Sequence, residues 1–295
     1  MTFHIILSFV LFCSHMTGQP SKDVTILKAK IDSLISTHQG TFAIAFKDLG
    51  SNKIFYINEH EYFHAASTMK TPVMIEVFKQ AHHKKLRLDD SIVVSNSFKS
   101  IIDSSAYSLE LTDDSDDGLY KRLGQKESIY NLVFKMITVS SNLATNILIG
   151  IVGPDNIMNT MKELNLNDMK VLRGVEDTKA FQAGKNNTTT AFDLSIMFER
   201  IAKKQCVSVE ACNSMLDILL AQKFNTMIPA KLPQTVKVAH KTGSITNVQH
   251  DSGIVYLPDG RSYVLVLLSK DLKSNSDGIE ILSRVSEEIF NFMVQ

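Results

Sequence analysis

The chain has 295 residues, of which 44% are hydrophobic and 21% are charged. Lysine plus arginine and aspartate plus glutamate each number 31, so the formal charge is zero, which argues against nucleic acid or an anionic membrane as the partner. With only 13 glycines and 6 prolines, a chain of this length can bury one large core or two lobes packed together. A small-molecule ligand fits this composition better.

The first residues, MTFHIILSFVLFC, contain an apolar run that is too short to span a bilayer and lies where a signal peptide has its hydrophobic region. We predict a signal peptide over residues 1–18 with cleavage near Gly18, and an exported, periplasmic mature chain without stable membrane insertion. A lipid anchor on Cys13 is the alternative. The bulky Phe12 disfavours it, because lipoprotein signals have a small residue before the cysteine.

The mature chain then keeps two cysteines, Cys206 and Cys212, in the segment KKQCVSVEAC. An oxidising compartment permits a disulfide across this short loop, but two buried thiols explain the sequence equally well. The Cα separation that decides between them cannot be obtained from sequence.

The first predicted elements are a helix over 23–38 and a β-hairpin over 41–58. The hairpin is indicated by two alternating runs, TFAIAFKD and KIFYIN, on either side of Gly50, Ser51 and Asn52. Both strands are therefore expected to pair with each other in an antiparallel sheet.

A helix is predicted over 67–86, where apolar residues recur at helical spacing and Pro72 lies in the first turns, a position that tolerates proline. Ser67 and Lys70 form an S-x-x-K sequence at its start. They lie one turn apart on the same face, so the Lys70 amine can hold or accept the Ser67 proton. The alternative is a serine N-cap followed by a surface lysine.

The stretch DDSDD at 113–117 is acidic. A Ca²⁺ site is one interpretation, but the ligand spacing and the glycine of an EF-hand loop are missing. We therefore interpret it as a solvated surface loop.

One continuous helix is predicted over 127–152, and Gly153 ends it. Ser140, Ser141 and Asn142 form an S-x-N sequence inside this otherwise apolar helix, where polar groups need partners. They are either satisfied helix-end hydroxyls or functional groups. In the functional interpretation Ser140 relays a proton to the leaving amide nitrogen and Asn142 holds a substrate amide.

The end of the chain returns to strands and closes with a helix. Strands are predicted over 235–244, 251–260 and 261–270, and an amphipathic helix over 278–294. Together with the first hairpin they indicate an α/β (α+β) fold, with a five-stranded antiparallel sheet from both chain ends, flanking helices and a helical lobe.

We predict one catalytic domain over 19–295. Its α/β lobe comprises 19–66 and 225–295, and its helical lobe comprises 67–224. No internal repeat or low-complexity linker divides it.

Lys241, Thr242 and Gly243 form a K-T-G sequence at the end of the strand VKVAH, and Ser244 follows. The backbone of such a strand can pair with an acyl-amide substrate, and the absent side chain at Gly243 leaves room for close approach. Lys241 and Thr242 are then expected to attract a carboxylate. By itself the pattern also describes an ordinary glycine-containing turn.

Taken together, S-x-x-K, S-x-N and K-T-G in this order are specific. The segments AASTMKTP, ITVSSNLATN and VAHKTGS each resemble the corresponding segment of class A β-lactamases, and DSGIVYLPDG resembles the strand pair that follows. The resemblance implies acylation of Ser67, an oxyanion hole from the N–H groups of Ser67 and Ser244, a β-lactam substrate and a monomer. It implies no metal and no organic cofactor.

Glu176, in VLRGVEDTKAF, matches the glutamate with which class A enzymes activate the water that hydrolyses the acyl-enzyme. The alternative is a solvated loop carboxylate. Four neighbouring positions depart from the family pattern: Ser141 replaces Asp, Arg173 lies three rather than two residues before the Glu, Asp177 replaces Pro, and Ala180 replaces Asn.

The segment between the first two motifs is also longer than usual, with the excess around the acidic stretch. Ser252 lies near the strand position where some members have a carboxylate-binding Arg. Lys270 and Arg261 are candidates to substitute for it.

The leading hypothesis is therefore β-lactam hydrolysis through a Ser67 acyl-enzyme. A D-alanyl-D-alanine peptidase or transpeptidase, or another serine amidase of this fold, shares the three motifs without requiring Glu176. A penicillin-sensing or interaction module is the third interpretation, but a domain that only binds has no chemical need for both Lys70 and Lys241.

Overall fold

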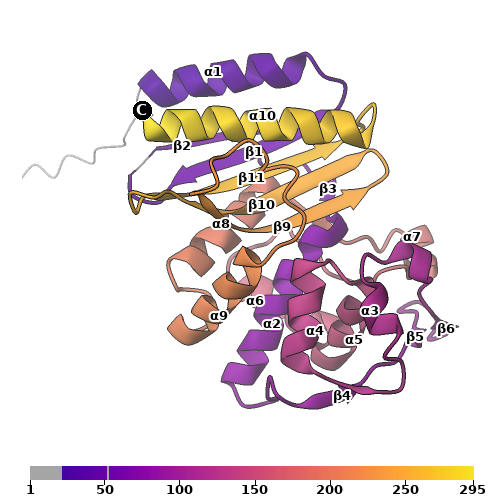
Figure 1. The fold of residues 1–295 in the computed structure, drawn as a ribbon. Helices are drawn as coiled ribbons and strands as arrows, with labels where there is room; N and C mark the ends of the chain where they lie inside the picture. Colours follow the sequence, from indigo (N-terminus) through magenta and orange to yellow (C-terminus); the bar gives the residue numbers. More distant parts are fainter. Residues whose placement is uncertain (1–21, 52) are drawn as a thin grey trace, which may run out of the picture.

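The computed structural model describes residues 22–51 and 53–295 (Figure 1). The predicted signal peptide over 1–18, and with it Cys13, lies outside these residues. Within the described part of the chain, no helix is both long enough and apolar enough to cross a membrane.

A five-stranded antiparallel sheet in the order β2-β1-β11-β10-β9 organises the fold. The strands come from both chain ends, as predicted. Strand β9, which carries the K-T-G sequence, lies at one edge. The strands are β1 (Thr41–Asp48), β2 (Ile54–Ile57), β9 (Lys237–Ile245), β10 (Val248–Tyr256) and β11 (Ser262–Lys270).

Helices cover both faces of this sheet. Helices α1 (Lys22–Ser36) and α10 (Asn275–Val294) lie side by side across one face, whereas α8 (Ala191–Ala202) packs on the other (Figure 1). Successive side chains of a strand point to opposite faces, so Phe42 belongs to the core under α1 and α10 and Ala43 to the core under α8. Burial on both faces explains why β1 is apolar almost throughout.

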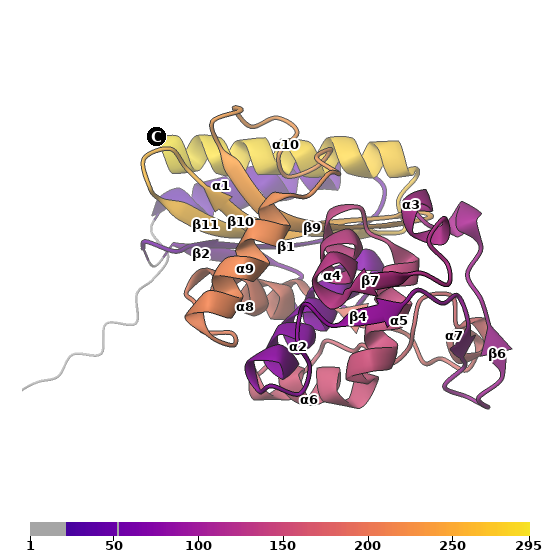
Figure 2. The same ribbon diagram turned by 60° about the horizontal axis from the view of Figure 1, so that its bottom comes forward.

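The helical lobe is built around α2, which contacts α4, α5, α6 and α9 (Figure 2). The start of α2 follows a 3₁₀ turn, Ala66–Met69, that contacts β9 and β10, so this end of the helix meets the edge of the sheet. The remaining helices are α2 (Lys70–His82), α3 (Asp117–Tyr120), α4 (Ile129–Thr138), α5 (Asn142–Val152), α6 (Pro154–Glu163), α7 (Thr178–Gln182) and α9 (Val209–Leu220).

The continuous helix predicted over 127–152 is wrong. Helix α4 ends at Thr138, and α5 begins at Asn142. Ser140, with φ 57°, has a left-handed backbone conformation that no helix can contain, and the Ser141 side chain caps α5. Gly153 ends α5 with φ 81°, as predicted.

Three short antiparallel ladders and a second 3₁₀ turn, Leu111–Asp113, complete the fold. Two ladders lie inside the helical lobe, which the sequence analysis did not anticipate because strands of two or three residues have no periodicity to detect. The paired strands are β3 (Phe63–His64) with β8 (Thr188–Thr189), β4 (Ser91–Val93) with β7 (Lys126–Ser128), and β5 (Phe98–Lys99) with β6 (Ala106–Tyr107).

Cys206 and Cys212 are both free in the described structure. Cys212 is buried in the large core, and burial raises the pKa of the Cys206 thiol to about 12. Of the two interpretations left open by the sequence, the structure therefore has the unpaired thiols.

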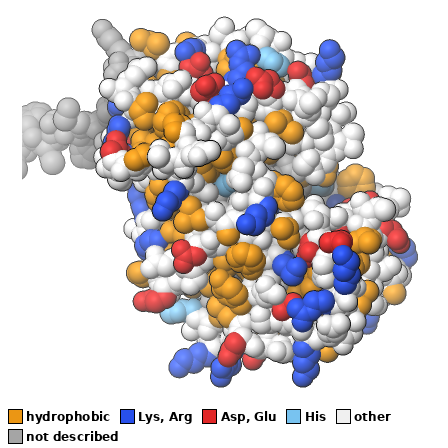
Figure 3. Space-filling view, in the orientation of Figure 1, with side chains coloured by type: hydrophobic (Ala, Val, Ile, Leu, Met, Phe, Trp, Pro, Cys, Tyr) orange, Lys and Arg blue, Asp and Glu red, His pale blue; other side chains and the backbone are white. Residues whose placement is uncertain are grey.

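The surface seen in Figure 3 carries basic and acidic side chains interspersed with apolar ones. This face has no large patch of a single sign. Its appearance agrees with the zero formal charge of the chain.

Candidate active site

Ser67 lies in the 3₁₀ turn that precedes α2, at the junction of the two lobes. Its side chain is partly exposed and lines a cavity of about 550 Å³. Lys70 begins α2 and is fully buried. The two residues of the S-x-x-K sequence thus differ in burial: Ser67 is partly exposed, and the Lys70 amine is desolvated.

Lys70, Ser140 and Lys241 form a continuous polar cluster. The Lys70 ammonium donates to the Ser140 carbonyl oxygen at 2.6 Å, to Asn142 Oδ1 at 2.7 Å and to Ser140 Oγ at 3.2 Å. Lys241 Nζ donates to the same Ser140 Oγ at 3.0 Å and to the Thr242 carbonyl oxygen at 2.8 Å. One hydroxyl thus bridges two buried lysines from different lobes.

Burial controls the charge of both lysines. It lowers the pKa of Lys70 to about 7, against a smaller raising effect of the Asp114 carboxylate. Burial, followed by the nearby Lys70, lowers the pKa of Lys241 well below its ordinary value. Two like charges that share one hydroxyl in a desolvated site disfavour each other, so the cluster readily gives up a proton near neutral pH.

Asn142 is fixed in a single orientation by its two amide atoms. Its Nδ2 donates to the Asp113 carbonyl oxygen at 2.6 Å, and its Oδ1 accepts from Lys70. Exchanging the oxygen and nitrogen would bring donor to donor and acceptor to acceptor. Asn142 also lines the cavity, where its amide is available to a ligand.

The outer edge of β9 forms another wall of the site. The carbonyl oxygens of His240 and Thr242 accept side-chain hydrogen bonds rather than strand bonds, from Gln222 Nε2 and Lys241 Nζ. Backbone groups of alternate residues point to the same edge of a strand, so the N–H of Ser244 also faces this open edge. Ser244 lines the cavity beside Ser67.

Gly243 permits this close approach of strand and nucleophile. A Cβ at Gly243 would lie 3.1 Å from the backbone nitrogen of Ser67 and 3.2 Å from the Cβ of Ala66. The room expected there for a substrate is thus also needed by the backbone of Ser67 itself. Ser67 and Ser244 line the same cavity.

The sequence profile of the β-lactamase enzyme family matches residues 26–293. The chain belongs to the β-lactamase enzyme family. Membership makes the protein a hydrolase of the β-lactamase type, as the motifs predicted.

Individual relatives are distant but match over nearly their full length. A β-lactamase from Bacteroides uniformis is 25% identical, with 99% of this chain and 100% of the relative covered. The TLA-1 extended-spectrum β-lactamase superposes with a TM-score of 0.82 at 20% identity, covering 93% of this chain and 100% of that chain. PBP-A superposes with a TM-score of 0.79 at 26% identity, covering 94% and 98%. These likenesses confirm the predicted fold.

Glu176 of this β-lactamase family member lines the same cavity as Ser67. The residue has φ 59° and an exposed side chain, and its carboxylate has no hydrogen-bond partner among the described residues. The neighbouring Val175 is held instead: its N–H donates to Asn146 Oδ1 at 2.7 Å, and its carbonyl oxygen accepts from Asn146 Nδ2 at 2.9 Å.

The unusual residues around Glu176 tie the loop to the β5–β6 hairpin. Asp177 accepts from Ser100 Oγ at 2.7 Å and from the Ile101 N–H at 2.9 Å, and it caps α7 through the Ala180 N–H at 3.1 Å. Lys179 pairs with Asp103 at 2.6 Å. The β5–β6 hairpin thus holds the loop on the C-terminal side of Glu176.

Neither proposed substitute for the carboxylate-binding arginine lines the cavity. Lys270 pairs with Glu61, and Arg261 pairs with Asp259 at 2.6 Å. Ser252 is buried between β10 and β9, where its Oγ donates to the Lys241 carbonyl oxygen at 3.4 Å. Arg173 is the sole lysine or arginine among the residues lining the cavity.

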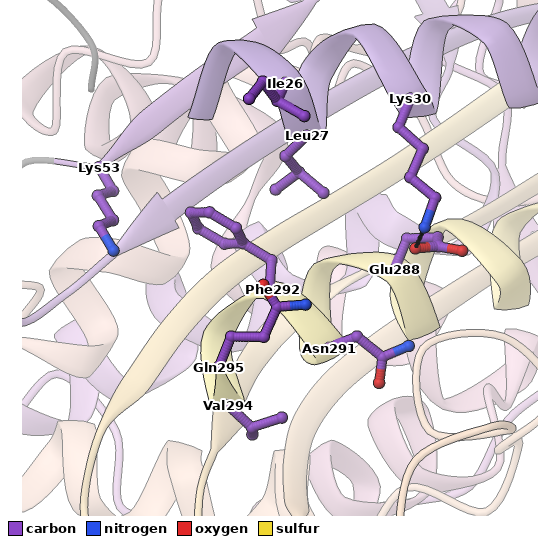
Figure 4. Close-up of a pocket in the computed structure, with 9 residues that line it drawn as sticks. All are labelled: Ile26, Leu27, Lys30, Lys53, Glu288, Asn291, Phe292, Val294 and Gln295. Atoms are coloured by element: carbon purple, nitrogen blue, oxygen red, sulfur yellow. Dashed lines mark hydrogen bonds and ion pairs between the residues drawn. The ribbon is translucent and has the colours of Figure 1, made fainter. Parts of the chain in front are cut away.

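A larger cavity, of about 870 Å³, lies between α1 and the end of α10 (Figure 4). Its lining includes Leu27 and Phe292, and its carboxylate, Glu288, is ion-paired with Lys30. None of its lining side chains is a hydroxyl or thiol, and none belongs to the three motifs. The smaller cavity at Ser67 is therefore the candidate active site.

Sequence analysis missed three groups that shape this site. Asn146 follows Asn142 by four residues and therefore shares its helix face, so spacing alone offered a signal. Buried Asn187 accepts from the Leu172 N–H at 2.8 Å and donates to the Arg173 carbonyl oxygen at 3.0 Å, which fixes the chain segment just before Glu176. Asp114 was assigned to a solvated loop, and no local pattern indicated its contacts.

Proposed function

We propose that this member of the family is a class A serine β-lactamase that hydrolyses the β-lactam amide through an acyl-enzyme on Ser67. The bridge from Lys70 through Ser140 Oγ to Lys241, beneath an accessible Ser67, is the observation that carries the proposal. A nucleophile next to a base that is itself oriented by further groups is the arrangement that covalent catalysis requires.

Acylation begins when neutral Lys70 accepts the Ser67 proton and Ser67 Oγ attacks the lactam carbonyl. A neutral amine keeps two N–H groups, enough for the Ser140 carbonyl oxygen and Asn142 Oδ1, and its lone pair is free for a hydroxyl proton. When the C–N bond breaks, Ser140 Oγ donates its proton to the leaving nitrogen. Protonated Lys70 then returns a proton to Ser140, so the cluster ends neutral.

We assign stabilisation of the developing oxyanion to the N–H groups of Ser67 and Ser244. Both residues line the cavity, and the Ser244 N–H faces the open edge of β9, where no described strand pairs with it. We assign the substrate carboxylate to Ser244, which lines the cavity, and to Lys241 and Thr242, which are buried behind it on β9. Asn142 binds the amide of the acyl side chain. No metal or organic cofactor takes part in these steps.

Hydrolysis of the ester requires an activated water, for which we assign Glu176 as the general base. Its support is its place on the cavity that contains Ser67 and its match to the family's glutamate. In ester hydrolysis the Glu176 carboxylate would act on a water rather than on Ser67, so its exposed position is compatible with this role.

The alternative is a D-alanyl-D-alanine peptidase or transpeptidase that β-lactams acylate persistently. Two observations favour it: the Glu176 carboxylate has no described hydrogen-bond partner, and PBP-A is as similar in fold as the β-lactamases. A PBP-A variant has been solved as an acyl-enzyme complex with penicillin G.

Steady-state turnover of nitrocefin, compared with intact-mass analysis after penicillin G, separates the two functions. A β-lactamase turns over many equivalents and shows at most a transient adduct. A penicillin-binding peptidase turns over about one equivalent and keeps the adduct, and this result would reject the β-lactamase assignment.

We further propose that the mature protein is an exported, periplasmic monomer with one catalytic domain over 19–295. The apolar leader over 1–18 supports export. Mass spectrometry of the protein recovered from the periplasm gives the cleavage site, and a retained lipid on Cys13 would reject simple secretion. Size-exclusion chromatography with light scattering tests the monomer.

A further inference from the structure

The first turn of α5 is capped by a carboxylate from outside the S-x-N motif. Asp114 Oδ1 accepts from the Asn142 N–H at 3.0 Å, and Oδ2 accepts from the Leu143 N–H at 2.8 Å. These are among the N–H groups that a helix leaves unpaired at its start, where its dipole also favours a negative charge. The motif's own residue, Ser141, reaches only the Ala144 N–H, at 3.3 Å.

We propose that Asp114 is a positioning residue for acylation, which holds the first turn of α5 and, through Asn142, orients the Lys70 amine. The proposal rests on the proposed function, because it concerns the Lys70 cluster that acylates Ser67. It assigns a role to the extra acidic segment, whose interpretation as a solvated loop is wrong for this carboxylate.

The contacts run without a gap from Asp114 to the base. Asp114 fixes the backbone of Asn142, and the carbonyl oxygen of the preceding Asp113 fixes its amide at 2.6 Å. The amide oxygen then accepts from Lys70 at 2.7 Å. Loss of Asp114 therefore releases Asn142, whose amide oxygen orients one of the Lys70 hydrogen bonds.

The loop that carries Asp114 is itself held in place. Asp116 is buried and pairs with Lys135 at 3.1 Å. The carbonyl oxygen of the same Lys135 accepts from the N–H groups of Val139 and Ser141 at 3.2 Å each. Lys135 thus ties the acidic segment to the turn between α4 and α5 that presents Ser140.

Asp114 also sets the local field. The charged groups facing Lys70 are Lys241, across Ser140 Oγ, and Asp114, beyond Asn142. The Tyr120 hydroxyl faces Asp114, and burial raises its pKa, so it stays neutral. Asp114 stabilises the Lys70 ammonium, which means that removing its charge lowers the pKa of Lys70 further.

The test uses Asp114→Asn and Asp114→Ala, with Asp117→Asn as the matched control. Asp117 lies in the same acidic stretch but is exposed and pairs with Lys121 alone among the described residues. Acylation by a fluorescent penicillin is followed by stopped flow from pH 5 to pH 9 (a range of about two units either side of the Lys70 pKa of about 7).

In both Asp114 variants we expect the plateau rate to fall by about tenfold and the acidic limb of the profile to move to lower pH by about half a unit or more. If Asp114 were only a structural cap, its loss would lower the acylation rate without shifting the acidic limb of the pH profile. An unmoved limb, or rates equal to those of Asp117→Asn, would therefore overturn the proposal.

A rescue variant keeps the test decisive if Asp114→Ala is unstable. Adding Ser141→Asp to Asp114→Ala returns a carboxylate to the start of α5, and we expect it to restore the plateau and the limb towards wild type. Failure to restore either, in a protein that melts as wild type does, also overturns the proposal. Failure of the proposed function is distinguishable. A wild type that acylates but keeps the adduct rejects the β-lactamase assignment and leaves this acylation test intact, whereas a wild type that does not acylate rejects the Ser67 acyl-enzyme itself.

Discussion

The two sides of the cavity at Ser67 differ in burial and hydrogen bonding. The buried side contains Lys70 and Lys241, and the exposed side contains Glu176. On the side of Lys70 and Lys241 the polar groups are buried and almost fully paired, and contacts reach back through Asn142 to Asp114. On the side of Glu176 the carboxylate is exposed and has no hydrogen-bond partner among the described residues, although the Val175 backbone and the Asp177 carboxylate beside it are held. The comparison indicates that acylation is preorganised, whereas deacylation depends on a water and a side chain that the fold leaves less constrained.

The largest effect is expected for Ser67→Ala, which removes the nucleophile next to the buried side of the cavity. It should abolish both nitrocefin turnover and the penicilloyl adduct, because no other hydroxyl lining the cavity has a buried lysine one helical turn away. Intact-mass spectrometry checks this result. Ser36→Ala, on exposed α1, is the control, and an adduct on the Ser67→Ala protein would mean that another residue is the nucleophile.

Lys70→Arg keeps a positive charge at the same place but cannot act as a base near neutral pH. We expect acylation to slow by about 10²- to 10⁴-fold, the usual contribution of a general base. In wild type the acylation rate should rise with pH through the Lys70 pKa of about 7 and then level off, since only the neutral amine accepts the Ser67 proton. Pre-steady-state rates across pH measure both effects, and a wild-type profile flat from pH 5 to pH 8 would remove Lys70 from this role.

Glu176→Gln tests the exposed side of the cavity and its assigned role in deacylation. If Glu176 activates the hydrolytic water, turnover should fall by about 10²- to 10⁴-fold while acylation stays near wild type, so that the Ser67 adduct accumulates and a burst precedes slow turnover. Glu163→Gln, on α6 and remote from the cavity, is the control. Turnover of nitrocefin at the wild-type rate by Glu176→Gln would make Glu176 a loop carboxylate and favour the peptidase interpretation.

This difference also explains what could be predicted from sequence. Ser67, Lys70 and the strand with Gly243 follow from helical spacing, a twofold strand period and a requirement for close approach, all of which are local. The break at Ser140 was missed because its left-handed φ replaces a helical residue within a strongly apolar run. Asp114 was missed because its partners lie 28 and 29 residues away.

The smallest effect is expected for Lys241→Ala, which removes a proposed substrate contact from the buried side of the cavity and keeps the proposed base, Lys70. A hydrogen bond to a charged group contributes about 1.5–3 kcal/mol, so KM for a carboxylate-bearing substrate should rise by about 10- to 100-fold with a smaller fall in kcat. Steady-state kinetics measure both changes, with Lys270→Ala as a control outside the cavity. A fall in kcat alone, at unchanged KM, would instead make Lys241 a proton donor to Ser140, because only that hydrogen bond would then be needed in the transition state alone.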